Sequence, residues 1–152
     1  MKLGVKAIPL LKKGLRHDNK NVRIGCLRVL DHFYDESVFS ELFSNLENND
    51  PEIRMWAIHA LACENCKEGE SRPGEEFIIP LVIKMLLNDE DRKVRQMAAG
   101  MLGPSVFRSD LALQALNHAY QNDTHPVVKK ICGWWIPGGV RYKNLKRSSF
   151  KK

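Results

Sequence analysis

The sequence predicts an all-α fold in which about four pairs of helices stack in tandem. One observation behind this prediction is a short string that recurs along the chain. In each copy a polar residue is followed by two variable positions, an apolar β-branched residue, a cation, and small or apolar residues at helical spacing. The other is an amphipathic run of helical period before each copy. Because one helical pair cannot bury its apolar face alone, such pairs are expected to seal one another by stacking.

The recurring strings fall into one register. They read NKNVRIGCLRVL, DPEIRMWAIHAL, DRKVRQMAAGML and HPVVKKICGWWI, beginning at Asn19, Asp50, Asp91 and His125. Their cations lie 31, 41 and 34 residues apart, at Arg23, Arg54, Arg95 and Lys129. The longest interval contains ENCKEGESRPG, residues 64–74, a polar stretch with Gly and Pro that predicts a loop insertion between two repeats.

The preceding runs supply the first helix of each pair. They occupy residues 7–15, 38–46, 77–87 and 110–120. We therefore expect repeats at about 5–33, 35–63, 75–103 and 105–137, within a single domain of residues 1–140. Asp50 and Asp91 are expected to cap the second helices that follow them, with Pro51 at a first helical position. In the fourth repeat His125 takes the cap position before Pro126.

These residues carry a resemblance to a known family. The pattern Asp-Pro-x-apolar-Arg, followed by small residues at helical spacing, resembles the HEAT repeat, and the short period is similar to the HEAT-like units of bilin lyases and bacterial adaptor proteins. The second repeat matches through Asp50, Pro51, Ile53, Arg54, Ala57, Ala60 and Leu61, and the third through Asp91, Val94, Arg95, Ala98, Ala99 and Leu102. The resemblance covers roughly residues 5–137 and implies a right-handed α-α superhelix, or solenoid. It indicates little about function, because fold does not imply chemistry.

Some positions of each second helix are predicted to stabilise the fold and not to bind a ligand. Ile53, Ala57, Ala60 and Leu61 form one helical stripe and are predicted to lie in the core. The recurring cations are predicted to form a ladder between repeats, with Arg23 reaching the Asp50 turn and Arg54 reaching the Asp91 turn, because planar guanidinium pairs well with carboxylate.

The remaining face of the second helices is the candidate binding surface. The resemblance implies that second helices line the concave side of the superhelix, where this chain would place large apolar side chains. The candidate groove residues are Met55, Trp56, His59, Met97, Ile131 and Trp134. Tryptophan and methionine are favoured where a surface grips a partner, so we predict a non-enzymatic scaffold or adaptor that binds a protein or peptide. The alternative is that the tryptophans fill a tightly curved core.

The charge distribution supports a second hypothesis. Residues 1–28 carry a net charge of +7, residues 29–140 carry −7, and residues 141–152 carry +6. After Pro137 and two glycines end the last helix, we expect residues 141–152 to be a mobile basic tail. Nucleic acid or an acidic partner could meet the N-terminal helix and this tail through Lys12, Lys13, Arg16, Arg141, Lys143, Lys146 and Arg147.

A possible metal site lies at the end of the second repeat. His59, Cys63 and Cys66 would share a face if the helix continued, and imidazole with thiolates suits zinc. A closed zinc site takes four ligands, however, and His17, His118 or Cys132 could be the fourth only by assumption. Repeat register also explains His59 as a groove position and Cys63 as the last helical turn. We therefore predict no metal and no other cofactor.

Enzymatic activity and secretion are both disfavoured. The chain has no GxSxG elbow, phosphate-binding glycine loop or HExxH motif. Some HEAT-like proteins are lyases or DNA glycosylases, but the groove positions lack the carboxylate that a glycosylase-like mechanism needs. The N-terminus does not resemble a signal peptide, no stretch approaches the roughly 20 apolar residues of a membrane span, and the cysteines suit a reducing compartment. We expect a cytoplasmic protein.

Overall fold

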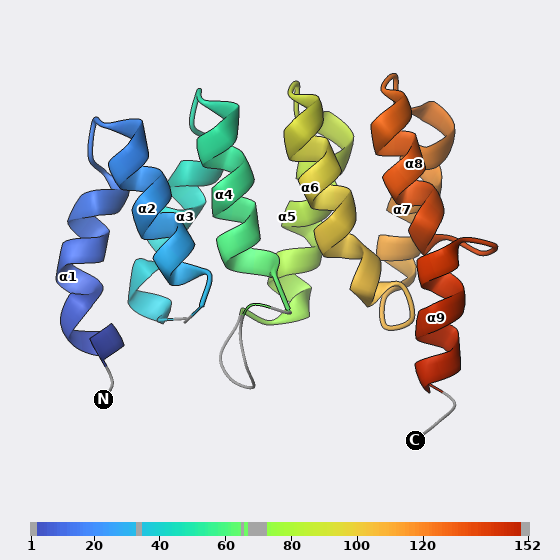
Figure 1. The fold of residues 1–152 in the computed structure, drawn as a ribbon, viewed down its shortest axis with the longest axis horizontal. Coiled ribbons are helices and arrows are strands. Elements are labelled where there is room, and N and C mark those ends of the chain that lie inside the picture. The colour runs from blue at the N-terminus through green and yellow to red at the C-terminus, as the bar shows by residue number, and fades with distance from the viewer. Residues whose placement is uncertain (1–2, 33–34, 65, 67–72, 150–152) are drawn as a thin grey trace. The chain divides into compact units, whose positions relative to one another are not determined.

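The computed structural model describes residues 3–32, 35–64, 66 and 73–149 (Figure 1). The chain divides into two compact units, Met1–Gly74 and Glu75–Lys152, which we name the N-terminal unit and the C-terminal unit. Each contains two helical pairs, and every regular element within the described ranges is helical. The predicted all-α fold of HEAT-like helical pairs is confirmed. The assignment of residues 1–140 to one domain stays a prediction.

The N-terminal unit holds the first two repeats. Helices α1 (Leu3–Leu15) and α2 (Lys20–Leu30) form the first pair. A 3-10 turn, η1 (Glu36–Val38), leads into α3 (Phe39–Leu46), which pairs with α4 (Pro51–Ala62). The second helices α2 and α4 lie side by side (Figure 1). Leucines from all four helices, including Leu15, Leu27, Leu42 and Leu61, are almost fully buried and belong to the core of this unit.

The C-terminal unit holds the third and fourth repeats and an additional helix. Its pairs are α5 (Glu75–Asn88) with α6 (Arg92–Leu102), and α7 (Asp110–Asn122) with α8 (Pro126–Trp135). The 3-10 turn η2 (Gly103–Ser105) follows α6, and α9 (Val140–Ser149) follows α8. Helices α6 and α8 pack together as α2 and α4 do in the other unit. The predicted loop insertion, residues 64–74, lies largely outside the described residues.

Side-chain caps begin all four second helices. The Asp50 carboxylate accepts a hydrogen bond of 2.8 Å from the backbone N–H of Glu52, and the Asp91 carboxylate accepts one of 2.7 Å from Lys93. The predicted caps at these two aspartates are confirmed. Asn19 caps α2 through its side-chain oxygen, and His125 caps α8 through Nδ1, which accepts from the backbone N–H of Val127 at 3.2 Å. Each cap satisfies a backbone donor that a helix start leaves without a partner.

The predicted core stripe of α4 is confirmed, since Ile53, Ala57, Ala60 and Leu61 are all buried. The predicted ladder of cations is realised between the third and fourth repeats. There Arg95 donates from Nε and Nη2 to the two carboxylate oxygens of Asp123, at 2.8 and 3.2 Å.

Arg23 and Arg54 donate mainly to backbone carbonyl oxygens just before their own helices. Arg23 donates to the carbonyl oxygen of His17 at 2.6 Å and to the side-chain oxygen of Asn45 at 3.2 Å, while Lys20 forms the ion pair with Asp50 at 2.8 Å. The predicted contact of Arg23 with the Asp50 turn is therefore wrong, because nearby carbonyl groups already use its guanidinium. Arg54 donates to the carbonyl oxygens of Asn48 and Asn49, and its predicted contact with the Asp91 turn stays a prediction.

The expectation of a mobile tail is wrong for residues 141–149, which belong to α9 (Val140–Ser149). Gly138 makes the bend between α8 and α9 with a φ of 95°, a conformation that glycine adopts without steric cost. The Tyr142 ring then packs on Phe107 with ring centroids 4.6 Å apart, and the Arg141 guanidinium lies over the Trp134 and Trp135 rings. Phe107 is distant from Tyr142 in the sequence, so the contacts that hold α9 could not be predicted from the basic composition of this segment. Residues 150–152 lie outside the described residues.

No helix in the described part of the chain combines the length and the apolar character that crossing a bilayer requires.

Candidate functional site

Three of the predicted groove residues lie on α4 of the N-terminal unit. Met55, Trp56 and His59 are half-buried, so their side chains retain contact with solvent. The guanidinium carbon of Arg28 lies 5.3 Å from the centre of the Trp56 ring, and this ring meets the His59 ring edge-on with centroids 5.5 Å apart. The packing of α2 beside α4 brings Arg28 over the indole. We name Arg28 and Trp56 the N-terminal Arg–Trp pair.

The other three predicted groove residues lie on the second helices of the C-terminal unit. Met97 on α6 and Ile131 and Trp134 on α8 are also half-buried. The guanidinium carbon of Arg141 lies 5.2 Å from the centre of the Trp134 ring, and we name these two residues the C-terminal Arg–Trp pair. The next residue, Trp135, is only 6% exposed. The alternative that a tryptophan fills the core therefore holds for Trp135 and not for Trp134.

The six candidate residues belong to two units. Their assembly into one concave groove therefore stays a prediction. Within its own unit, each second-helix face also has room beside a glycine, because an added Cβ would meet nothing within 4 Å at Gly25 of α2 or at Gly100 of α6.

The basic residues of the N-terminal helix that were predicted to contact a partner differ in their exposure and in whether they already form an ion pair. Lys13 is exposed and Lys12 is half-buried, whereas Arg16 is ion-paired with the buried carboxylate of Glu41. Burial raises the pKa of Glu41. A hydrogen bond from the Ser40 hydroxyl and the positive charges of Lys12 and Arg16 lower it by more than burial raises it, so the net pKa lies below its usual value. Arg16 thus neutralises a buried acid.

The basic residues of α9 are less restrained. Lys143 and Lys146 are exposed. Arg141 is exposed as well, although its guanidinium covers two tryptophans. The side chain of Arg147 lies outside the described part of the chain.

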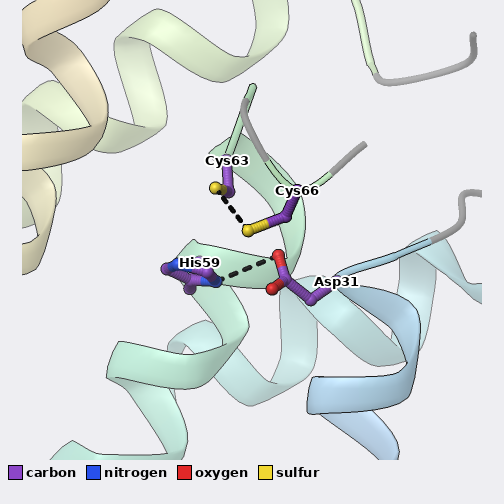
Figure 2. Close-up of side chains that lie close together, drawn as sticks. All are labelled: Asp31, His59, Cys63 and Cys66. Atoms are coloured by element: carbon purple, nitrogen blue, oxygen red, sulfur yellow. Dashed lines mark hydrogen bonds and ion pairs between the residues drawn. The ribbon is translucent and has the colours of Figure 1, made fainter. Parts of the chain in front are cut away.

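A cluster of metal-ligating side chains lies within the N-terminal unit, at the ends of α2 and α4 (Figure 2). It consists of Asp31, His59, Cys63 and Cys66, whose ligating atoms all lie within 4.8 Å of one another. His59 Nδ1 is 3.0 Å from Asp31 Oδ1, and the two sulfur atoms are 2.9 Å apart. Figure 2 shows all four side chains gathered around a common centre.

Helix termination places these four residues. Asp31 follows the last residue of α2, and its backbone N–H donates to the carbonyl oxygen of Leu27 at 3.0 Å. Cys63 follows the last residue of α4, with its N–H donating to the carbonyl oxygen of His59 at 3.0 Å. Cys66 lies three residues beyond Cys63, and its side chain faces the end of α4, with the two sulfur atoms 2.9 Å apart (Figure 2).

Burial governs the chemistry of this cluster. Asp31 and Cys63 are buried, and His59 and Cys66 are half-buried. Burial, the Cys63 thiol and the Asp31 carboxylate together raise the pKa of the Cys66 thiol to about 12. A catalytic cysteine needs a lowered pKa, because the thiolate is the nucleophile. The cluster is therefore poorly suited to nucleophilic catalysis.

Comparison with known families agrees with the helical pairs. A model of HEAT repeats matches residues 8–73, and a model of a single HEAT repeat matches residues 78–104. The chain belongs to the HEAT-repeat family. The predicted resemblance is confirmed, and no curated protein matches the chain. HEAT repeats typically mediate protein interactions and are generally non-catalytic.

The HEAT register contains a signal by which Asp31 could have been predicted. With the offset of 31 residues between Arg23 and Arg54, Asp31 occupies the position of Ala62, directly before Cys63. Two stacked HEAT repeats place equivalent helix ends side by side, so the register could have identified Asp31 as a neighbour of Cys63. Within the described residues, His17, His118 and Cys132, the fourth ligands considered above, do not belong to the cluster.

Proposed function

We propose that this HEAT-repeat protein is a non-enzymatic scaffold or adaptor that binds a protein or peptide partner. The observation that carries the proposal is the pair of half-buried tryptophans, Trp56 and Trp134, each on a second helix and each with an arginine over its ring. Tryptophan and arginine are among the residues most enriched where protein interfaces concentrate their binding energy.

The chemistry of the surrounding surface suits an apolar partner segment. Met55, Met97 and Ile131 add flexible or branched apolar area on the same helices as the tryptophans or on neighbouring ones, and methionine adapts to irregular partner shapes. Open space beside Gly25 and Gly100 would allow a partner backbone to approach the second helices closely. We propose that these apolar residues, together with His59, form one concave binding groove.

The same surface offers little for catalysis. Five of the six proposed groove residues, Met55, Trp56, Met97, Ile131 and Trp134, carry no group that serves in general acid–base catalysis. The sixth, His59, has its Nδ1 3.0 Å from Asp31 Oδ1, within the cluster at the ends of α2 and α4. This composition supports a binding role.

The experiment compares capture of partners by the full chain and by variants. Immobilised wild-type protein is exposed to lysate of the native cell, retained proteins are identified, and each is purified and titrated calorimetrically. We expect Trp56→Ala combined with Trp134→Ala to weaken the binding of a specific partner at least about 30-fold, because two anchors worth about 1 kcal/mol or more each are removed.

The matched control is Phe77→Ala. Phe77 is a large aromatic residue on the first helix α5 and is 64% exposed, so its loss removes apolar surface away from the second helices. Partner affinity should not change in this variant. Equal weakening by Phe77→Ala and by the tryptophan variant, at unchanged helicity, would contradict the proposal.

A second candidate function is association with nucleic acid. The observation that favours it is the exposed position of Lys143 and Lys146 on α9, whose sequence VRYKNLKRSS contains no acidic residue. The engagement of Arg16 with Glu41 removes part of the predicted N-terminal contribution. We therefore place this alternative mainly on α9.

A further inference from the structure

We propose that Asp31, His59, Cys63 and Cys66 bind one zinc-type divalent cation in a closed structural site. The inference is independent of the partner that the protein binds. It reverses our expectation of no metal, because the structure supplies the fourth ligand that the sequence did not reveal.

The donor set suits zinc. Two thiolates, one imidazole and one carboxylate are all ligands that Zn²⁺ accepts, and four protein ligands make a structural site with no open position. Softer ligands such as these two sulfurs disfavour Mg²⁺ and Ca²⁺, which prefer oxygen. The cluster also joins ligands from two repeats, so a bound ion would link separate segments of the chain.

The geometry requires only small movements. In a tetrahedral site with Zn–S bonds of about 2.3 Å, the two sulfur atoms lie roughly 3.8 Å apart, and nitrogen and oxygen ligands lie roughly 3.3 Å apart. The corresponding distances are 2.9 Å between the Cys63 and Cys66 sulfurs and 3.0 Å between His59 Nδ1 and Asp31 Oδ1. To admit the ion, both of these pairs would have to open, and the widest of the other separations, which reach at most 4.8 Å, would have to shorten by about 1 Å.

The helix ends favour a cation at this place. Asp31 is at the C-terminus of α2, and His59 and Cys63 are at the C-terminus of α4. Helix C-termini carry partial negative charge, so a buried carboxylate beside two of them is stabilised by nearby positive charge. A divalent cation would supply that charge and would also stabilise the thiolate forms of both cysteines.

Aromatic contacts around the cluster orient one of its ligands. Trp56 meets the His59 ring edge-on, and the Arg28 guanidinium lies over the indole. Such contacts restrict the orientation of the imidazole, which metal sites commonly require of their histidine ligands.

Two simpler alternatives each explain only half of the cluster. An ion pair between Asp31 and a protonated His59 leaves the two cysteines unexplained. A disulfide between Cys63 and Cys66 leaves the buried Asp31 and the half-buried His59 unexplained, and both cysteines are free thiols in this structure. Metal binding gives a role to all four.

The first experiment titrates the full chain, purified with its thiols reduced and freed of metal by chelator, with Co²⁺ alone. We expect saturation at one Co²⁺ per chain, with the visible absorption of tetrahedral cobalt and the ultraviolet charge-transfer bands of cobalt–thiolate bonds. Stoichiometric Zn²⁺ should then displace the cobalt and raise the melting temperature of the protein above that of the metal-free form.

The second experiment compares ligand variants with a matched control. Cys66→Ser and Asp31→Asn should each weaken cobalt binding beyond the about 10- to 100-fold that loss of an outer-shell partner costs. Cys26→Ser is the control, because Cys26 is half-buried on α2 and does not belong to the cluster. It should bind cobalt as the wild type does.

Because a ligand variant can also lose stability, the wild-type titration decides the matter independently. Absence of tetrahedral cobalt absorption in the reduced wild-type protein would overturn the proposal. So would binding that Cys66→Ser and Asp31→Asn leave unchanged, or a site that forms equally with Cys63 and Cys66 linked in a disulfide.

Discussion

Asp123 organises the turn that joins α7 to α8. Its carboxylate accepts hydrogen bonds from Arg95 at 2.8 and 3.2 Å and from the backbone N–H of His125 at 2.7 Å. Burial raises the pKa of Asp123. The hydrogen bonds from Arg95 and His125 lower it by more than burial raises it, so the net pKa lies below its usual value. The ionised form is therefore the one that the folded protein stabilises.

We expect Asp123→Ala to lower the free energy of unfolding by about 2–3 kcal/mol at pH 7, because the variant removes hydrogen bonds between charged groups in a buried place. A group with a depressed folded pKa contributes stability above its unfolded pKa of about 3.9, and this contribution disappears as the pH falls through the folded value. Urea denaturation at a series of pH values would measure both effects.

Asp110→Ala is the control for this prediction, because Asp110 lies in the first turn of α7 and is exposed to solvent. Its removal should cost no more than about 1 kcal/mol. A stability difference between wild type and Asp123→Ala that stays constant down to pH 2 would show that the carboxylate charge is not responsible.

At the scale of an element, the close approach of η2 to α8 depends on a glycine. The Trp135 ring lies directly against Gly103, so close that an added Cβ would overlap the ring atoms. Because Trp135 is almost fully buried, it has little room to retreat. Only glycine fits at position 103 without displacing the Trp135 ring.

Gly103→Ala should lower the free energy of unfolding by about 1–3 kcal/mol, as overpacking of a filled core does. Gly100→Ala is the matched control in α6. An added Cβ there meets nothing within 4 Å, and alanine is favoured in a helix interior, so stability should rise by about 0.5–1 kcal/mol. Thermal or urea unfolding would separate the two variants, and equal effects would refute the assignment of Trp135 as the obstacle.

The elements also show what local sequence can and cannot predict. The helices of the four repeats and their aspartate caps follow from periodicity and capping chemistry, which act over a few residues. Helix α9 was missed because its stabilising contacts join Tyr142 to Phe107 and Arg141 to two tryptophans, and such pairings are invisible in a basic segment with little apolar periodicity. Asp31 was missed because its role depends on which helix end lies beside it.

At the scale of the whole molecule, we expect that substitutions can abolish nucleic-acid binding without affecting the binding of a protein partner. Lys143→Glu combined with Lys146→Glu reverses two exposed charges on α9 and leaves Trp56 and Trp134 in place. We expect this variant to keep protein-partner affinity. Its affinity for single-stranded nucleic acid should fall, and the slope of log affinity against log salt should decrease by about 0.7 for each phosphate that the variant no longer neutralises.

Fluorescence anisotropy with a labelled oligonucleotide at several salt concentrations would measure this effect. The control is the charge-neutral change Asn144→Gln on the same helix. Nucleic-acid affinity of the wild type that does not depend on salt, or that the double reversal leaves intact, would exclude α9 as an electrostatic contact.

The cap at His125 makes the start of the fourth repeat depend on a ring tautomer. Because Nδ1 accepts from the N–H of Val127, the ring must carry its proton on Nε2, so α8 begins correctly with only one of the two neutral forms of the imidazole. Asn19, Asp50 and Asp91 cap α2, α4 and α6 through side-chain oxygen atoms, which need no such choice. Any partner or neighbouring group that withdrew the Nδ1 lone pair would therefore loosen the first turn of α8 and leave the other three second helices capped.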